Sequence, residues 1–224
     1  MIDLDPIALT AKLALITTLI LFIIAIPLCY WLTYSRFRFK AVIEAIISLP
    51  LVLPPSVLGF YILIAFSPEN AFGKFLSEYF DLRLVFTFEG LILSSVLYSL
   101  PFMVNPILSG LKNIPGTLQE ASFTLGKSRF TTIIKIILPN IRASLLTGII
   151  MTFAHTIGEF GVVLMVGGSI PKETKVVSIA IYDEVESMNY HNANVYAGIL
   201  FIFSFLILLT VYLINNKSRK PNLF

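Results

Sequence analysis

Two side chains capable of acid–base chemistry, His155 and Glu159, lie four positions apart in an apolar stretch of the chain. At this spacing they share one face of a helix, where the imidazole can pair with the carboxylate. An enzyme would use such a pair as a base and its orienting partner, but no nucleophile or metal-binding motif accompanies it. The two histidines, His155 and His191, are 36 residues apart, so we expect no metal site.

The same pair has two other interpretations, and both remain open. Gly158 and Gly161 flank Glu159. A carboxylate inside a membrane helix costs about 2.5 to 3.5 kcal/mol on insertion scales unless it is paired or hydrated, so it belongs in a bundle interior or at a subunit interface. There it either braces the helix packing through a hydrogen bond or lines a path for a transported solute.

Three prolines, Pro50, Pro54 and Pro55, interrupt a second apolar stretch. Proline lacks the backbone N–H and breaks a helix, and carbonyls freed at membrane depth are tolerated only where protein covers them or a cavity faces them. We therefore predict a break in this stretch. It is either a packing kink or part of a transport path.

The elements that position these residues are membrane helices. Of the 224 residues 57% are hydrophobic and 13% are charged, and the mean hydropathy is +0.88, which lies outside the composition of soluble domains. A helix needs about 20 apolar residues to cross the hydrocarbon core. We predict an all-α integral membrane protein in which residues 1–224 form one domain with about five transmembrane helices, at residues 7–34, 41–66, 90–110, 143–166 and 195–214.

The basic residues predict the orientation in the lipid bilayer. Lys and Arg are retained on the cytoplasmic side of membrane spans, and eleven of the sixteen follow the first span, the third span or the fifth. We therefore expect the N-terminus outside and the C-terminus in the cytoplasm, and we attribute the net charge of +3 to this asymmetry and not to nucleic-acid binding. The external segment at 174–184 is too short to span and is expected to form a re-entrant or interfacial helix.

The longest cytoplasmic loop, at about 111–142, carries specific local signals. Thr117 and Glu120 have the spacing of a capping box, and Gly126 can take the positive φ of a helix C-terminus. We predict a short helix over Thr117–Leu125 and a second helix from Ser128 towards the membrane. The sequence "ASFTLGKS" within this loop lacks the first glycine of a phosphate-binding loop and follows no buried strand, so we expect no nucleotide site in this chain.

A charged surface helix of this kind either anchors on lipid or docks a protein. The stretch "EASFTLGKSRFTTIIKIILP" resembles the EAA loop of bacterial binding-protein-dependent ABC importers, in which E-A-A, a glycine four or five residues on and a terminal I-x-L-P recur. The matching residues are Glu120, Ala121, Ser122 in place of the second alanine, Gly126, Ile136, Leu138 and Pro139. The resemblance implies that the first helix of the loop fits a cleft on a separate ATPase subunit, which binds ATP and Mg, and that it passes movement to the spans.

Three further stretches extend the resemblance over most of the chain: "IPLCYWLTYSRF", "SLPLVLPPSVLGF" and "GEFGVVLMVGGSIPKET". They are similar to permease subunits for tetrahedral oxyanions, most of all to those for molybdate, with sulfate and tungstate importers as alternatives. The resemblance implies a type I importer permease fold, a place in the bacterial inner membrane and no enzyme activity or cofactor in this chain. The residues expected along the translocation path or its gate are Pro54, Pro55, His155, Glu159, Phe160 and Gly161.

The expected partners follow from the same comparison. Five spans supply half of the enclosure that a path needs, so we expect a second copy of the chain and two copies of the ATPase subunit. Few basic side chains lie near membrane depth, which leaves recognition of the anion to an external oxyanion-binding protein. An intramembrane enzyme that uses His155 and Glu159, and a structural scaffold, remain as distant alternatives.

Overall fold

The computed structural model describes residues 3–218, and within this part of the chain every regular element is helical. The α-helices are α1 (Asp5–Tyr34), α2 (Lys40–Ser48), α3 (Pro55–Phe66), α4 (Ala71–Phe80), α5 (Phe88–Lys112), α6 (Gly116–Thr124), α7 (Arg129–Thr132), α8 (Leu138–Asn140), α9 (Arg142–Gly158), α10 (Gly161–Gly167), α11 (Val177–Glu186) and α12 (Tyr190–Ser218). A 3-10 turn covers Leu49–Leu51 and a π-helical turn covers Ile133–Ile137. The all-α prediction is confirmed.

Three helices are long and apolar enough to cross a membrane unaided: α1, α5 and the Tyr190–Thr210 part of α12. Two further candidates are bent pairs, in which Lys40–Leu51 meets α3 at 109° and Arg129–Asn140 meets α9 at 76°. The described residues therefore contain three spans, or up to five if each bent pair is one span. The upper number agrees with the prediction of about five.

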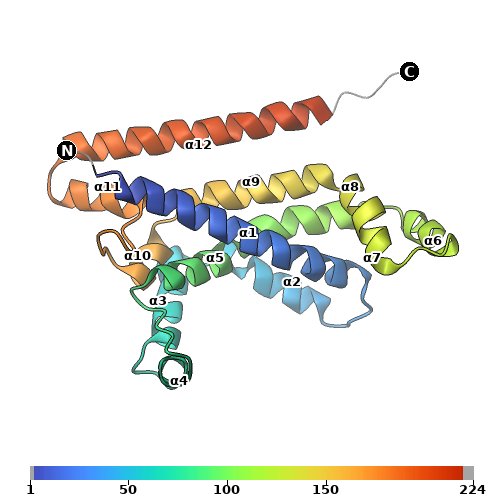
Figure 1. Ribbon diagram of the computed structural model, residues 1–224, viewed down its shortest axis with the longest axis horizontal. Helices are drawn as coiled ribbons and strands as arrows, with labels where there is room; N and C mark the ends of the chain where they lie inside the picture. Colours follow the sequence, from blue (N-terminus) through green and yellow to red (C-terminus); the bar gives the residue numbers. More distant parts are fainter. Residues whose placement is uncertain (1–2, 219–224) are drawn as a thin grey trace.

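The predicted break in the second apolar stretch is present. Pro50 lies in the 3-10 turn, and Pro54 has a ψ of 136° before α3 begins at Pro55. A proline withholds its N–H from the helix and disfavours helical angles at the residue before it, so Pro55 prevents Pro54 from continuing α2. As a result α3 runs across the long direction of the bundle instead of along it (Figure 1).

The fourth predicted span, at 143–166, is not one helix. α9 ends at Gly158, Glu159 is extended with a ψ of 129°, and α10 begins at Gly161. The prediction that Glu159 lies inside a continuous helix is therefore wrong. Gly158 and Gly161 are poor helix formers, which lowers the cost of leaving the helix between them.

The centre of the molecule is a bundle of α1, α5 and α9. Its fully buried residues include Leu21 and Cys29 on α1 and Met103 and Ile107 on α5. A Cβ atom on Gly148 of α9 would lie 3.1 Å from the carbonyl oxygen of Met103, which is tighter than most packing contacts, so glycine favours the close approach of the two helices. Because lipid is as apolar as the bundle interior, close packing of this kind holds membrane helices together.

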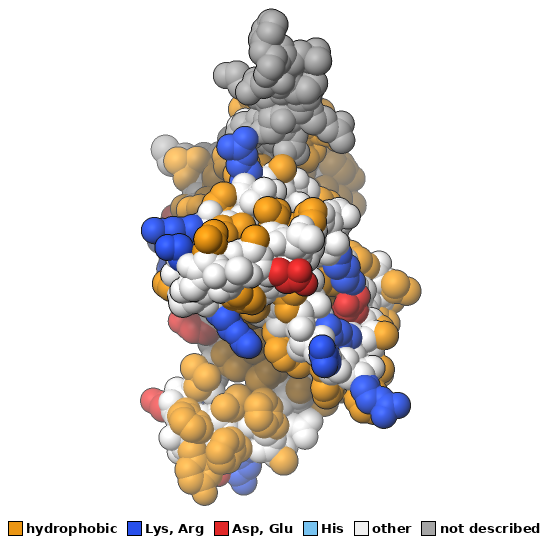
Figure 2. Space-filling model, turned by 90° about the vertical axis from the view of Figure 1, so that its right-hand side faces the viewer, with side chains coloured by type: hydrophobic (Ala, Val, Ile, Leu, Met, Phe, Trp, Pro, Cys, Tyr) orange, Lys and Arg blue, Asp and Glu red, His pale blue; other side chains and the backbone are white. Residues whose placement is uncertain are grey.

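The two ends of the bundle contain different segments. In Figure 1, α6 and α7 lie at the same end as the last turn of α1, whereas α10 and α11 lie at the other end. Figure 2 looks onto the α6 and α7 end and shows Lys and Arg side chains around it. These segments are the ones predicted to face the cytoplasm; the tail residues Arg219 and Lys220, which belong to the same prediction, lie outside the described residues.

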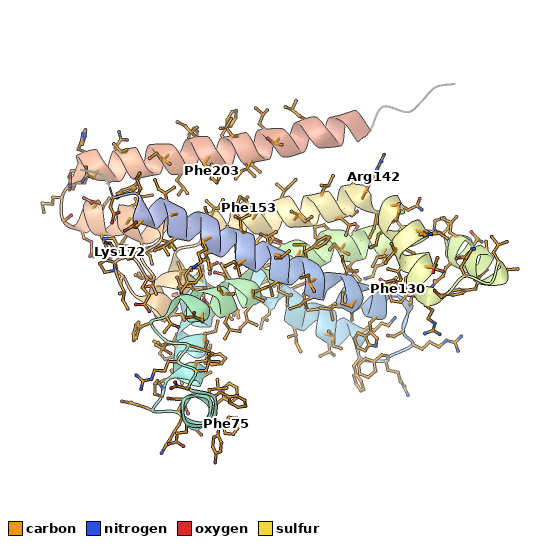
Figure 3. All side chains as sticks on the ribbon, in the orientation of Figure 1. Phe75, Phe130, Arg142, Phe153, Lys172 and Phe203 are labelled. Atoms are coloured by element: carbon orange, nitrogen blue, oxygen red, sulfur yellow. The ribbon has the colours of Figure 1, made fainter. Side chains whose placement is uncertain are left out.

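Two short helices lie near the end opposite α6. The segment expected to be helical at 174–184 overlaps α11, which runs to Glu186, has ten residues and cannot cross a membrane. The sequence analysis did not predict α4, which projects from the bundle beyond α3 and carries Phe75 (Figure 3). On α4, Lys74 and Glu78 form an exposed ion pair at 3.7 Å.

Cysteine labelling tests the predicted orientation. In a Cys29→Ala background, we expect Lys127→Cys to react with a membrane-impermeant thiol reagent only after spheroplasts are permeabilised, and Ser187→Cys to react in intact ones. Both positions are exposed, and they follow α6 and α11 at opposite ends of the bundle. A gel-shift assay gives the labelled fractions. Equal labelling of the two positions in intact spheroplasts would contradict the orientation.

Candidate transport path and coupling loop

Most of the predicted path residues gather where α9, α10 and α3 meet. The chain passes from α9 to α10 through Glu159 and Phe160, which we call the joint. A cavity of about 540 Å³ lies there, lined by Pro55, Ser56, Tyr98, Ala154, His155, Gly158, Glu159, Phe160 and Gly161. Five of the six predicted residues therefore share one cavity. The sixth, Pro54, is exposed at the start of α3 and is not part of its lining.

Glycine residues allow α3 and α10 to touch. A Cβ atom on Gly161 would lie 2.7 Å from the Cβ of Pro55, and one on Gly59 would lie 2.8 Å from the Cβ of Met165. Neither distance is compatible with normal packing, so these contacts require glycine. Because Pro55 and Gly161 are the first residues of their helices, the N-terminal ends of α3 and α10 meet at the cavity.

Residues of α5 hold the imidazole of His155. Its Nδ1 lies 2.9 Å from the Oγ of Ser99, and its ring stacks on Phe102 with 3.9 Å between centroids. The ring of Tyr98 lies 4.9 Å away. The suggested pairing of His155 with Glu159 is not formed, because the chain leaves the helix at Glu159 and the one-turn geometry is lost.

Glu159 lies inside the protein at the joint. It is 4% exposed, and its carboxyl group lies next to the Oγ of Ser95 on α5, although the two do not have the geometry of a regular hydrogen bond. Its backbone carbonyl, in contrast, accepts a hydrogen bond of 2.6 Å from the Oγ of Ser178 on α11. The Oγ of Ser95 is buried too, and it has no other partner among the described residues. Buried polar groups of this kind are costly and are found at functional sites more often than in ordinary packing.

The cavity lining suits weak contacts with a passing solute. It offers the hydroxyl of Ser56, the phenol of Tyr98, the imidazole of His155 and the carboxyl group of Glu159, and no Lys or Arg. Tight binding of an anion favours the charged donors that are missing here. No group of three or more metal-ligating side chains exists among the residues that the structure describes.

The first helix of the cytoplasmic loop begins without the predicted capping box. α6 starts at Gly116 after Pro115, and no side chain caps its first turn. Because Gly116 already belongs to the helix, Thr117 lies within the first turn instead of before it. This places the Thr117 side chain too far along the helix to serve as the N-cap partner of Glu120.

The end of α6 agrees with the prediction for Gly126. This residue has a φ of 71°, and the N–H of Lys127 donates to the carbonyl of Ser122 at 3.1 Å, as in a Schellman motif. The Oγ of Ser128 then accepts from the N–H of Thr131 at 3.2 Å and caps α7. The predicted second helix is therefore present, divided into α7, a π-helical turn and α8.

Two side-chain hydrogen bonds attach α6 to its neighbours. The Oγ of Ser122, which is buried, lies 2.8 Å from the Oγ1 of Thr132 on α7. The Nε2 of Gln119 donates to the phenol oxygen of Tyr30 on α1 at 3.1 Å. Ser122, the one departure from the E-A-A pattern, thus adds a buried hydrogen bond that alanine lacks.

The other loop residues divide between surface and core. Glu120, Ala121 and Pro139 are exposed, while Leu138 packs against the central core. Sequence reasoning missed the residues that hold these sites together: Tyr30, Ser56, Tyr98, Ser99, Thr132 and Ser178. The one available signal was the spacing of small polar residues on α5 (Ser95, Ser99) and α9 (Thr152, Thr156), which places each pair on one helix face.

Solved structures show the class of fold. The chain aligns with a bacterial alginate ABC transporter, solved in complex with an alginate pentasaccharide-bound periplasmic protein, at a TM-score of 0.78 and 18% identity over 97% of this chain and 79% of that one. For the MetNI methionine ABC transporter in inward-facing conformations, the TM-score is 0.72 at 17% identity over 96% of this chain and 95% of that one. The fold is that of type I ABC importer permeases.

Sequence comparison shows the family. Residues 22–219 match the family described as "Binding-protein-dependent transport system inner membrane component", and the chain belongs to it. The Molybdenum transport system permease protein ModB of Azotobacter vinelandii is 44% identical over 94% of this chain and 93% of its own length. The Probable sulfate transport system permease protein cysT of Prototheca wickerhamii is 31% identical over 96% of this chain and 84% of its own length.

Substitution of two neighbouring glycines tests the packing at the joint. We expect Gly161→Ala to lower the thermal unfolding midpoint of the detergent-purified protein, because its Cβ would overlap Pro55; overpacking of this kind costs about 1 to 3 kcal/mol. Gly158→Ala is the matched control, since a Cβ there meets nothing within 4 Å. Equal midpoints for the two variants would show that α3 and α10 do not meet as described.

Proposed function

We propose that this chain is the membrane-spanning permease of an ATP-driven importer that carries molybdate into the cytoplasm. One observation carries the choice of solute: the 44% identity to a molybdenum permease extends over nearly the full length of both chains, whereas the sulfate permease of Prototheca wickerhamii shares 31%. Sulfate is the alternative, and tungstate is hard to distinguish from molybdate because the two anions share charge and shape.

The cavity at the joint is the proposed passage for the anion. Its hydroxyl, phenol and imidazole groups can exchange hydrogen bonds with an oxyanion without retaining it, which suits transport better than storage. Affinity and specificity then reside in an external oxyanion-binding protein, where the anion is fully enclosed. The distant enzyme alternative loses its geometric basis, because His155 contacts Ser99 and not Glu159.

The cytoplasmic loop is the proposed contact with the ATPase. Around Glu120 it exposes large apolar side chains: Leu118 (40% exposed), Phe123 (40%), Leu125 (75%) and Phe130 (72%). An apolar surface in aqueous surroundings favours a protein partner. ATP and Mg then belong to that partner, and the bonds from Ser122 and Gln119 carry the displacement of α6 into α7 and α1.

The proposed assembly contains two copies of this chain, two ATPase subunits and one external binding protein. Pro55 and Ser56 line the cavity and are exposed at the surface of a single chain, so one copy leaves the passage incompletely enclosed. A second copy related by a two-fold axis closes it, and two-fold symmetry is the commonest arrangement of homo-oligomers. Each copy then offers one loop to one ATPase subunit.

Deletion of the gene in its bacterial host tests the function. We expect uptake of labelled molybdate at low external concentration to fall to background, and molybdenum-dependent enzyme activity to fall with it. Excess external molybdate should restore that activity through less specific routes, and a plasmid copy of the gene should restore uptake. If sulfate uptake collapsed and molybdate uptake did not change, the solute would be wrong; if neither changed, the importer role would be wrong.

A further inference from the structure

α4 has an aromatic face and a charged face. The helical repeat of its sequence, "AFGKFLSEYF", places five apolar side chains on one side: Phe72, Phe75, Leu76, Tyr79 and Phe80. Lys74 and Glu78 lie on the opposite side, where they form the exposed ion pair at 3.7 Å. The helix is therefore amphipathic, and its ten residues are too few to cross a membrane.

The rest of the chain leaves the aromatic face of α4 open. The exposed fractions are 54% for Phe72, 47% for Phe75, 74% for Tyr79 and 66% for Phe80. The ring of Phe75 packs on two of the others, with centroid distances of 4.9 Å to Tyr79 and 5.9 Å to Phe80. An exposed apolar patch of this size marks contact with another protein or with a membrane.

The direction of α4 suits a membrane surface. Figure 1 shows this helix end-on, whereas α1 and α5 run across the view, so α4 lies nearly perpendicular to the spans. It also lies closer to α10 than to α6, towards the end of the bundle that is predicted to face outward. A helix that rests in the interface of a bilayer has this direction relative to helices that cross the bilayer.

The aromatic face of α4 is turned along the bundle, towards the α6 end. The side chain of Phe75 lies on that side of α4 in Figure 3. Figure 2, which looks from the α6 end, shows hydrophobic side chains gathered on the lobe at the bottom, where α4 lies. The spans extend in the same direction, so under the predicted orientation the hydrocarbon core faces the aromatic side of α4.

The turn between α3 and α4 joins the two helices firmly. The Nδ2 of Asn70 donates to the carbonyl of Ile64 on α3 at 2.9 Å. A Cβ atom on Gly73 would overlap the carbonyl oxygen of Ser67, so only glycine permits this close approach. α3 begins at Pro55, which lines the cavity at the joint. A contact that fixes α4 therefore also fixes one wall of the cavity.

We propose that α4 binds the outer-leaflet interface of the lipid bilayer through its aromatic face, and that this contact holds α3 in place beside the cavity. Aromatic side chains with a polar end, such as Tyr79, are enriched at this level of a membrane. The occupant is lipid and not a protein, because a protein that arrives from outside would meet Lys74 and Glu78 on the charged face. The proposal does not depend on which solute is transported.

Tryptophan fluorescence tests the position of the aromatic face. Trp31→Phe removes the single tryptophan of the chain, and Phe75→Trp in this background reports on the face itself. In vesicles that contain the full-length chain, we expect lipids brominated near the headgroup to quench most of its emission. Lipids brominated near the ends of the acyl chains should quench less, because an interfacial helix sinks only about 5 to 10 Å.

Lys74→Trp in the same background is the matched control, since it lies on the opposite face of the same helix. Iodide on both sides of the vesicle membrane should quench Lys74→Trp strongly and Phe75→Trp weakly. Strong quenching of Phe75→Trp by iodide would place the aromatic face in water, and no quenching by either agent would place it against protein. Equal quenching of both variants by brominated lipid would immerse the whole helix. Each of these results would overturn the proposal.

Hydrogen exchange tests whether the lipid contact holds α3. In the complete permease–ATPase complex in nanodiscs, we expect Phe75→Ser with Tyr79→Ser to make the amides of α3 exchange several times faster than in the wild type. Lys74→Ser with Glu78→Ser changes two exposed residues of the charged face and should leave this exchange unchanged. Unchanged exchange in the aromatic variant, or equally faster exchange in both variants, would overturn the role of lipid in holding α3.

Discussion

Inside a bilayer every backbone N–H and C=O group must find a partner within the protein, and the structure around the joint depends on this constraint. The chain leaves the helical conformation between α2 and α3 and again between α9 and α10. The two breaks lie against each other, because α10 packs on α3 through Gly59 and Gly161. The Ser178 hydroxyl of α11 donates a hydrogen bond to the carbonyl of Glu159. The polar side chains that line the cavity are Ser56, Tyr98, His155 and Glu159. Non-helical backbone at membrane depth is tolerated beside such a cavity.

α9 connects the two regions to which function is assigned. It runs unbroken for 17 residues from Arg142, just after the cytoplasmic loop, to Gly158 at the joint. Its packing against α1 and α5 makes it part of the rigid centre of the molecule, while Phe153 faces Phe203 on α12 at 6.5 Å (Figure 3). In the proposed mechanism, α6 moves one end of this unit when ATP binds to the partner, and the displacement reaches the joint at its other end.

Much of the architecture was predictable because it follows from composition and local chemistry. Apolar length predicted the spans, the prolines predicted the break before α3, and Gly126 predicted the end of α6. Two predictions were wrong because local signals competed. The capping box at Thr117 failed because α6 begins one residue earlier, after Pro115. The continuous helix through Glu159 failed because α9 ends at Gly158, although hydropathy favoured a longer helix.

The contacts that assemble the site could not be predicted in the same way. Ser99, Ser178 and Thr132 carry no motif of their own, and their partners come from other elements, at separations of 56, 19 and 10 residues. Their pairing depends on the rotation and depth of each helix, which a single sequence does not specify. Five of the six residues that the sequence suggested for the path line one cavity, whereas only the fold showed that His155 contacts Ser99 and does not pair with Glu159.

The central claim is that water and solute reach the cavity at the joint, and thiol accessibility measures this directly. In the assembled complex with Cys29→Ala, Ser56→Cys at the cavity should react with a small charged thiol reagent at a rate that changes when the ATPase partner binds ATP. Phe203→Cys should stay unreactive in nanodiscs, because it lies on α12, an apolar candidate span that is only 11% buried within the chain, and a charged reagent does not enter lipid. A Ser56→Cys variant as unreactive as Phe203→Cys in every nucleotide state would contradict the account.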